Sequence, residues 1–109
     1  MANTFKLKTK ANVGVTTVGI YTAPAATTTV LIGITLANTS GSGVNVGVGI
    51  TRAGTTEDVK LLKNAPIPQG SSLEFMGGNK VVLETTDTLT VDSDTNNSID
   101  AALTIMEIT

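Results

Sequence analysis

The 109-residue sequence contains no cysteine, no histidine and no tryptophan. Without cysteine, the chain forms no disulfide and offers no thiolate to a metal ion or a substrate. Without histidine, it lacks the commonest general base and the commonest transition-metal ligand. We therefore expect no enzyme, no catalytic residue, no resident cofactor and no metal site.

Aromatic residues and positive charges are also scarce. Phe5, Tyr21 and Phe75 are the only aromatic residues, which counts against an aromatic-lined ligand pocket. A carbohydrate- or receptor-binding module is therefore a further alternative that the composition disfavours. The net charge is −2 and Arg52 is the single arginine, whereas nucleic-acid binders carry a clustered basic face. We expect no nucleic-acid partner.

Long apolar runs are absent as well. Residues 1–6 lack the apolar core of a secretory signal. The longest apolar stretch, Val30–Ala37, is too short to span a bilayer. We expect no membrane partner, and synthesis in a cytoplasm.

Branched side chains dominate what is present. Threonine, valine and isoleucine supply 39 of the 109 residues, and such residues fit a pleated sheet better than a helix. Apolar residues alternate with small or polar ones over 30–37 and over 44–51, so every second side chain is expected to face a core. The polar segment 38–43 between these runs has the composition of a hairpin loop. The residues predicted to share one core are Val30, Ile32, Ile34, Leu36, Val44, Val46, Val48, Ile50, Leu83, Leu89, Val91, Leu103 and Ile105.

Seven further strand-like segments complete the pattern. They are residues 5–10, 15–21, 57–63, 71–76, 80–84, 88–92 and 98–108, with two of the turns at Ala53–Thr56 and Gly77–Asn79. Roughly eight or nine short strands with regularly spaced turns are typical of an all-β sandwich or barrel. We predict one antiparallel β-sandwich domain over residues 1–109, with about eight strands, jelly-roll-like or immunoglobulin-like.

One basic row stands out near the N-terminus. Lys6, Lys8 and Lys10 alternate with Phe5, Leu7 and Thr9. Lysines on an edge strand prevent sheets of different molecules from pairing, and we favour that interpretation. A docking strand for an acidic partner would use the same three lysines.

Small residues lie opposite the two strongest apolar rows. A glycine within a strand often marks a close approach of another backbone. The set is expected to form a flat face that is either exposed to solvent or in contact with another subunit. Its members are Gly33, Thr35, Asn45, Gly47, Gly49 and Thr51.

A cluster of acidic and amide residues follows the strand at 88–92. Asp92, Asp94 and Asn96 have the spacing of the first three ligands of a calcium loop. The pattern then fails, because Asn97 stands where the loop needs glycine and Leu103 where it needs glutamate. We interpret the cluster as turn chemistry.

Several segments resemble a known family. They are Ile20–Pro24, Ala37–Ser40, Leu61–Leu73, Gly77–Glu84, Thr86–Val91 and Ile105–Ile108. Together they span roughly residues 15–109 and resemble a small β-sandwich virion structural protein of tailed bacteriophages, especially those of marine and cyanobacterial-type hosts. The matching motifs are structural, so the resemblance transfers no catalytic or ligand-binding residue.

The resemblance implies a non-enzymatic virion component. The first expectation is a multi-copy capsid decoration (cement) protein that bridges neighbouring capsid subunits. A tail-, neck- or fibre-associated protein is the close alternative. The implied partners are the major capsid protein or the tail and neck proteins, together with other copies in a homo-oligomer. The implied location is the virion, after synthesis in the cytoplasm of the host bacterium.

Overall fold

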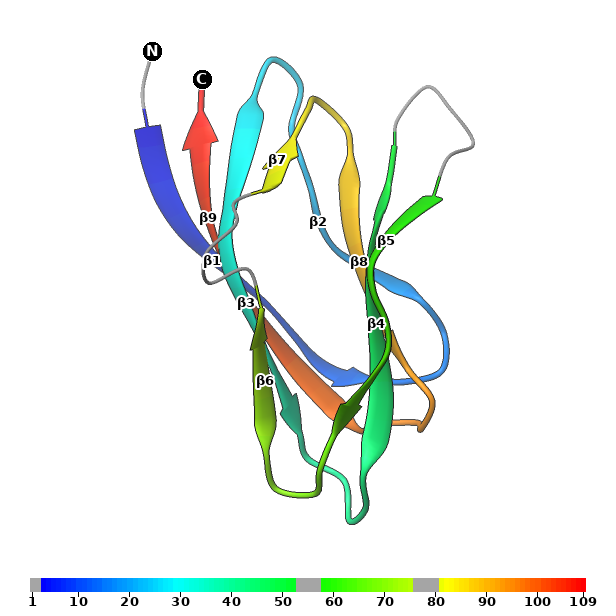
Figure 1. Cartoon of the computed structure of the whole chain (residues 1–109). Coiled ribbons are helices and arrows are strands. Elements are labelled where there is room, and N and C mark those ends of the chain that lie inside the picture. The colour runs from blue at the N-terminus through cyan, green and yellow to red at the C-terminus, as the bar shows by residue number, and fades with distance from the viewer. Residues whose placement is uncertain (1–2, 53–57, 76–80) are drawn as a thin grey trace.

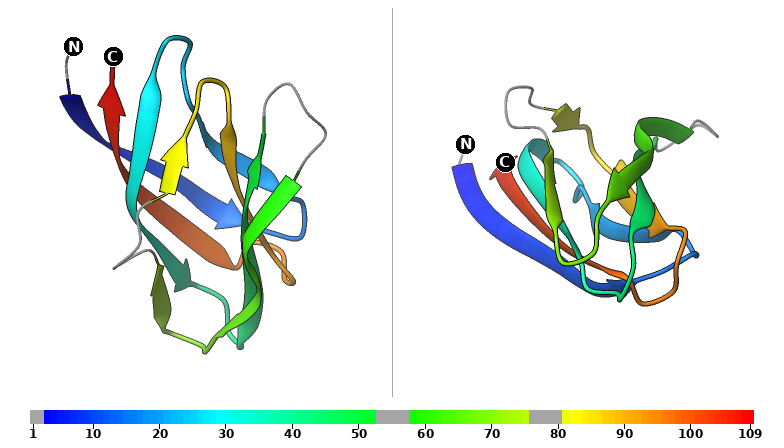
Figure 2. Two further views of the ribbon diagram at one scale, coloured as in Figure 1. Left: turned by 45° about the horizontal axis from the view of Figure 1, so that its top comes forward. Right: turned by 60° about the horizontal axis from the view of Figure 1, so that its bottom comes forward.

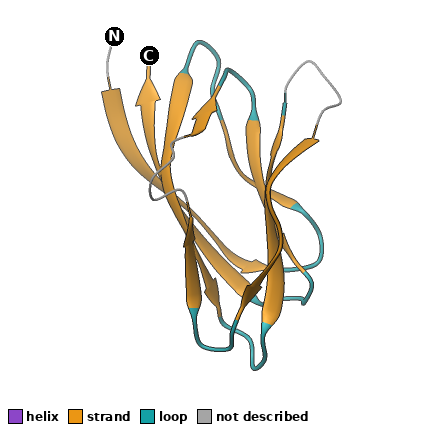
Figure 3. Ribbon diagram, in the orientation of Figure 1, coloured by secondary structure: helices purple, strands orange, loops and turns teal. Residues whose placement is uncertain are grey.

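A computed structural model describes residues 3–52, 58–75 and 81–109. Over these residues it consists of strands and loops without any helix, as Figure 3 shows. The strands are β1 (Asn3–Val13), β2 (Val18–Thr22), β3 (Thr28–Asn38), β4 (Val44–Thr51), β5 (Asp58–Ile67), β6 (Ser72–Phe75), β7 (Val81–Leu83), β8 (Thr88–Ser93) and β9 (Ile99–Ile108). The predicted all-β class is therefore confirmed, and the described residues include no helix that could cross a membrane.

The strands form two antiparallel sheets that face each other (Figures 1 and 2). Sheet A has the order β1-β9-β3-β6, with β7 also paired to β3, and sheet B has the order β2-β8-β4-β5. The pairs are nested: β1 with β9, β2 with β8, β3 with β6 and β7, and β4 with β5. An antiparallel ribbon rolled up in this way is a jelly roll, which decides between the two predicted sandwich types.

The connection between β3 and β4 differs from the predicted hairpin. The two strands lie in different sheets, so residues 39–43 cross from one sheet to the other. The buried Asn38 side chain holds this crossing, because its Nδ2 donates to the carbonyl oxygens of Ser42 (2.8 Å) and Ile67 (3.0 Å). A polar loop of this composition suits both a hairpin and a crossing between sheets, and the long-range pairing of the strands determines which of the two forms.

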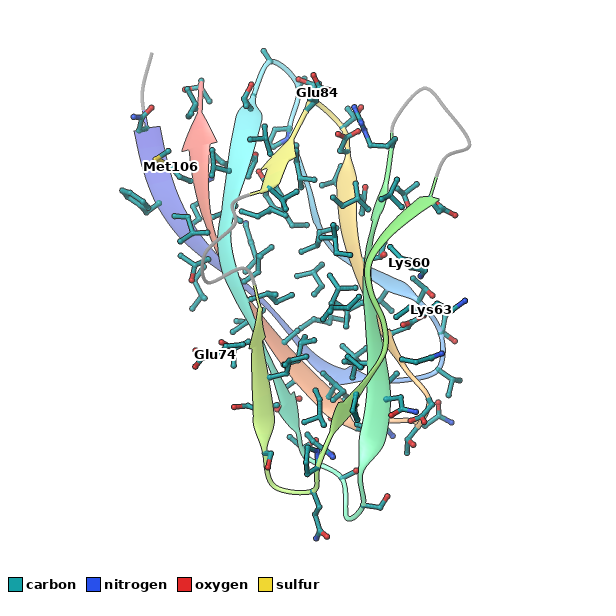
Figure 4. All side chains as sticks on the ribbon, viewed as in Figure 1. Lys60, Lys63, Glu74, Glu84 and Met106 are labelled. Atoms are coloured by element: carbon teal, nitrogen blue, oxygen red, sulfur yellow. The ribbon has the colours of Figure 1, made fainter. Side chains whose placement is uncertain are left out.

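The core lies between the sheets and contains most of the predicted residues. Eleven of the thirteen are buried, and they are joined by others that include Val13, Tyr21, Leu31, Ile67 and Ile99. Figure 4 shows side chains filling the space between the two layers.

Val30 and Ile32 were predicted in the core, and this prediction is wrong. Leu31 pairs with Ile105 and Gly33 with Thr104, so Ile32 is an extra residue in a β-bulge. A bulge shifts the alternation by one position. Leu31 consequently points inward with no exposed surface, while Val30 and Ile32 are only partly buried.

Strand β5 is longer than the sequence pattern indicates. It continues through Pro66 to Ile67, where the sequence suggests only an extended crossing. β5 is the edge strand of sheet B, so the missing N–H of Pro66 is tolerated there. The turns predicted at Ala53–Thr56 and Gly77–Asn79 lie outside the described residues.

Candidate interaction surfaces

Strand β1 is a free edge of sheet A, and its lysine row faces inward. Lys6 lies opposite Ile105 and Lys8 opposite Leu103, and residues directly opposite in a sheet share a face. Because Ile105 and Leu103 are fully buried, the lysines lie on the inner side of the sheet. Phe5 and Leu7 consequently point outward and are 68% and 64% exposed.

The inward row meets a buried polar network that joins the two sheets. The hydroxyl of Tyr21 on β2 donates to Glu107 Oε2 on β9 at 2.6 Å and shares a hydrogen bond of 2.7 Å with Thr29 Oγ1 on β3. Lys6 Nζ on β1 lies 2.9 Å from Glu107 Oε1. Glu107 and Tyr21 are each only 6% exposed, so each polar atom needs the partner it has.

The network shifts the pKa values of both acids. The hydrogen bond from Tyr21, followed by that from Lys6, lowers the pKa of the Glu107 carboxyl below its ordinary value. Burial, with the adjacent Glu107, raises the pKa of Tyr21 to about 12. Glu107 is therefore a carboxylate and Tyr21 a neutral donor around neutral pH.

Two of the three candidate docking lysines thus have partners within the chain. Lys6 pairs with Glu107, and Lys8 Nζ lies 6.0 Å from the centroid of the Tyr21 ring. The edge position agrees with the protective interpretation, since inward-pointing charges discourage edge pairing. Docking through Lys6, Lys8 and Lys10 stays a prediction.

Sequence reasoning missed Glu107, although its position carried a signal. Ile99, Ala101, Leu103 and Ile105 form one alternating row, and Glu107 is the next member. A carboxylate on a core-facing row requires a buried partner. The structure supplies this partner from the other end of the chain, as Lys6 of β1.

The six small residues do not form one face. Gly33 and Thr35 belong to β3 in sheet A, whereas the other four belong to β4 in sheet B. Gly47 and Gly49 are buried by their own chain. The Asp92 carboxylate lies over Gly47, and the side chains of Lys60 and Thr90 lie beside Gly49. The expectation of a single flat face formed by Gly33, Thr35, Asn45, Gly47, Gly49 and Thr51 is wrong, and a subunit contact through either part stays a prediction.

The outer face of sheet B is polar. One row across all four strands consists of Thr22, Thr88, Thr51 and Asp58, and we call it the threonine row. Thr22 Oγ1 and Thr88 Oγ1 lie 2.9 Å apart in a hydrogen bond. The lysines labelled in Figure 4, Lys60 and Lys63, project outward from β5 at this side.

The outer face of sheet A carries the opposite chemistry. Phe5 pairs with Met106, Met106 with Val30, and Val30 with Val82, so these four side chains form a row across β1, β9, β3 and β7. We call it the apolar row. Phe5 is 68% and Val82 53% exposed, and Figure 4 shows Met106 on the side facing away from the core.

The acidic cluster at the end of β8 stabilises the adjoining turns through hydrogen bonds. Asp94 Oδ1 accepts from the backbone N–H of Asn45 at 3.1 Å, and Asp92 Oδ2 accepts from Thr17 Oγ1 at 3.1 Å. Asn97 adopts a positive φ of 52°, which asparagine tolerates in turns. Within the described ranges, no group of three acidic side chains could hold a metal ion.

A shallow depression of about 390 Å³ opens between β4, β5 and β7. Arg52 lies in its wall with Arg52 Nε 3.0 Å from Asp87 Oδ2, and Glu84 also pairs with Arg52. The described lining contains compensated charges and aliphatic side chains such as Ile50 and Val59, with no nucleophile beside a base.

Comparison with known proteins identifies the fold alone. No family model and no curated protein matches the sequence. Among solved structures, a protein of the disulfide-linked pili of Bacillus endospore appendages aligns with a TM-score of 0.59 and 14% identity over 99% of this chain and 87% of that chain. The acid-stable capsid of Helicobacter pylori bacteriophage KHP30 aligns with a TM-score of 0.59 and 7% identity over 100% of this chain and 89% of that chain.

A third similar structure comes from another virus. The chain aligns with a protein of infectious bursal disease virus, Gx strain, with a TM-score of 0.55 and 12% identity, and the alignment covers 95% of this chain but 32% of that chain. At such low identities the three likenesses show a shared jelly-roll architecture.

Proposed function

We propose that this protein is a non-enzymatic structural component of a tailed-phage virion, present in many copies as a capsid decoration protein that bridges neighbouring capsid subunits. The observation that carries the proposal is the alignment of the complete chain with a protein of a bacteriophage capsid structure. The resemblance of its sequence motifs to tailed-phage structural proteins points in the same direction.

The arrangement of chemical groups supports an assembly role. The described part of the chain places its charged groups in ion pairs, turns and exposed positions, and it sets an apolar row and a threonine row on opposite outer faces. Two unlike faces allow one side to contact neighbours while the other meets solvent. Repeated over symmetric copies, weak contacts gain avidity of about 10²–10⁴.

The assembly would do without disulfides. The similar endospore appendage protein belongs to disulfide-linked pili, whereas this sequence has no cysteine. We expect buried apolar area and hydrogen bonds at the contacts to provide the cohesion.

Quantitative mass spectrometry of purified particles tests the proposal. A decoration protein is expected on the order of hundreds of copies per particle, as icosahedral repetition requires. Particles that lack the protein would exclude the virion role. A count of only a few copies, in multiples of three or six, would instead place it in the tail, neck or fibre.

A filament subunit is the second candidate, because the pilus protein aligns as well as the capsid protein. Immunogold labelling separates the two. Gold particles distributed over the capsid shell support decoration, and labelling along cell-surface filaments supports the second candidate.

A further inference from the structure

We propose that the apolar row of sheet A is a contact face between two copies of this chain, related by a two-fold axis parallel to the strands. The inference deepens the proposed function and rests on it for the partner, because a protein present in many copies meets itself. The row consists of Phe5, Met106, Val30 and Val82, each directly opposite the next across four strands.

The face around the row is an extended apolar surface. Leu7 lies next to Phe5 on the outer side of β1 and is 64% exposed. Ile108 follows Met106 on the same side of β9, and the bulged Ile32 borders the same outer surface beside Gly33 and Thr104. Large apolar side chains gathered on an exposed sheet face commonly mark an interaction site.

The apolar row and the residues directly beside it carry no outward charge, which suits a second copy, and the outward carboxylates Glu74 and Asp100 lie farther along the strands. Along 3–7, 28–32, 81–83 and 104–108, the charged residues Lys6 and Glu107 point inward and pair with each other. The polar residues that point outward there, such as Thr28 and Thr104, are neutral. A two-fold contact sets a patch against itself, so a charged patch would oppose like charges. A neutral one avoids that penalty.

The order of side chains along the row is self-complementary. A two-fold axis parallel to the strands reverses the row, so that Phe5 meets Val82 of the second copy and Met106 meets Val30 of the second copy. Each contact then combines a long or aromatic side chain with a short branched one, which favours interdigitation. The axis also keeps the strands of the two sheets aligned, as sheets prefer when they stack.

The available area fits a small symmetric dimer. Strands about 4.8 Å apart and residues about 3.4 Å apart give the apolar part of the face roughly 300 Å² and the whole outer face of sheet A roughly 700 Å². A standard interface buries about 800 Å² per partner around an apolar centre with a polar rim. The apolar row would form that centre, and Thr9, Ala102, Thr35 and the carboxylate of Glu74 would lie in the polar rim.

A charge-complementation experiment tests both the face and the axis. Sedimentation velocity is measured for the wild-type chain, Phe5→Lys, Val82→Glu and an equimolar mixture of the two variants. The wild type is expected to dimerise with a micromolar Kd, and each variant alone is expected to weaken association by about tenfold or more, as loss of an interface anchor does. In the mixture, the introduced lysine of one chain meets the introduced glutamate of the other, while the second contact keeps its native Phe5 and Val82. Dimers are therefore expected to return.

Thr22 provides the matched control. It ends the threonine row on the edge strand β2, as Phe5 ends the apolar row on the edge strand β1. Thr22→Lys and Thr22→Glu are expected to dimerise like the wild type. Thermal melting of every variant verifies folding, and the high exposure of Phe5 and Val82 makes retained folding the expected result.

Three outcomes would overturn the inference. The first is a wild-type chain that stays monomeric at about 0.5 mM, far above a micromolar Kd. The second is a Thr22 variant that disrupts the dimer as strongly as Phe5→Lys. The third is a dimer restored by mixing Phe5→Lys with Phe5→Glu, because that result would place residue 5 of one copy against residue 5 of the other. Each readout concerns the purified protein alone, so a missing virion location would leave the dimer result unchanged.

Discussion

The apolar row and the threonine row occupy equivalent places in the two sheets, yet they carry opposite chemistry. Each crosses four antiparallel strands on an outer face, and each ends on an edge strand, at Phe5 in β1 and at Thr22 in β2. Strand geometry therefore does not decide what faces outward. The identity of the outward-facing residues decides it, and of these two rows only the one in sheet A presents exposed large apolar side chains.

The inner sides of the sheets differ in a related way. The inner side of sheet B carries an aliphatic row, in which Val46, Val48 and Ile50 of β4 are all buried. Sheet A ends its inner row with Glu107 and borders it with Lys6. In β1 the lysines point inward and the apolar residues point outward, which is the reverse of the usual arrangement in a sandwich. A free edge strand can carry this reversal because its inward lysines reach solvent past the unpaired edge, as the 44% exposure of the Lys6 side chain shows.

The largest effect is expected at Leu31, and its neighbour Ile32, on the opposite side of sheet A, provides the comparison. Leu31→Ala should destabilise the fold by about 2–5 kcal/mol, as removal of a large core side chain does. Ile32→Ala should cost about 1 kcal/mol or less, because the bulge turns Ile32 outward. Urea denaturation of both variants measures the difference. Equal costs would mean that Ile32 packs in the core as Leu31 does, and therefore that the bulge and the outer face of β3 are wrongly assigned.

Glu107→Gln should have the next largest effect. It removes the charge partner of Lys6 and weakens the acceptor of the Tyr21 hydroxyl, at a cost of about 1–3 kcal/mol. Because the folded state lowers the pKa of Glu107, its stabilisation is complete above the unfolded-state pKa of about 4.3 and is lost as pH falls through the lower folded value.

Denaturation of the wild type and of Glu107→Gln between neutral and acidic pH measures this loss. The difference in stability between them should shrink as the solution becomes acidic. A constant difference over that range would show that the Glu107 charge does not stabilise the fold. Near the basic end, the neutral Tyr21 hydroxyl contributes stability that is present below about pH 10 and is lost as pH rises toward its raised pKa of about 12.

Two glycines of sheet B test how tightly its outer face is packed. A Cβ at Gly49 would lie 2.9 Å from the backbone oxygen of Val59, so Gly49→Ala must move β5 and should cost about 1–3 kcal/mol. At Gly47 the obstacle is the Asp92 carboxylate, which can rotate away. Gly47→Ala should therefore be the milder change by thermal melting, and the reverse ranking would contradict the described packing.

Calcium should have the smallest effect, namely none. The carboxylates of Asp92 and Asp94 on the polar side accept hydrogen bonds from Thr17 and Asn45. The melting temperature should be the same with millimolar calcium and with a chelator. A rise of several degrees with calcium would reveal a site, since a ligand that binds the native state stabilises it, and the polar face would then have a binding role of its own.

Most of the fold could be predicted from the sequence. Alternation of branched and polar residues predicted the strands and eleven buried core residues, because a period of two leaves a strong local trace. It failed at Leu31 and Ile32, since a bulge of one residue depends on the pairing with β9. The connection at residues 39–43 failed for a similar reason, because sheet membership is a long-range property.

The surfaces were harder to predict. In the first strand, either the lysine row or the row of Phe5 and Leu7 could face inward, and the choice depends on Glu107, about a hundred positions along the chain. The glycines of β4 suggested an open face, whereas cross-strand pairing places Asp92 over Gly47. Local patterns identify which residues share a row, and only the complete topology tells which side the row faces.

The central claim is that the two outer faces differ in use, and hydroxyl-radical footprinting as a function of protein concentration tests it most directly. Oxidation of Phe5, Leu7 and Met106 should fall as the concentration rises through the micromolar range. Val15, which is 55% exposed in the loop after β1, serves as the reference and should be oxidised equally at every concentration. Protection of Phe5, Leu7 and Met106 with unchanged oxidation of Val15 is the predicted result. Equal oxidation of the row at all concentrations would contradict it.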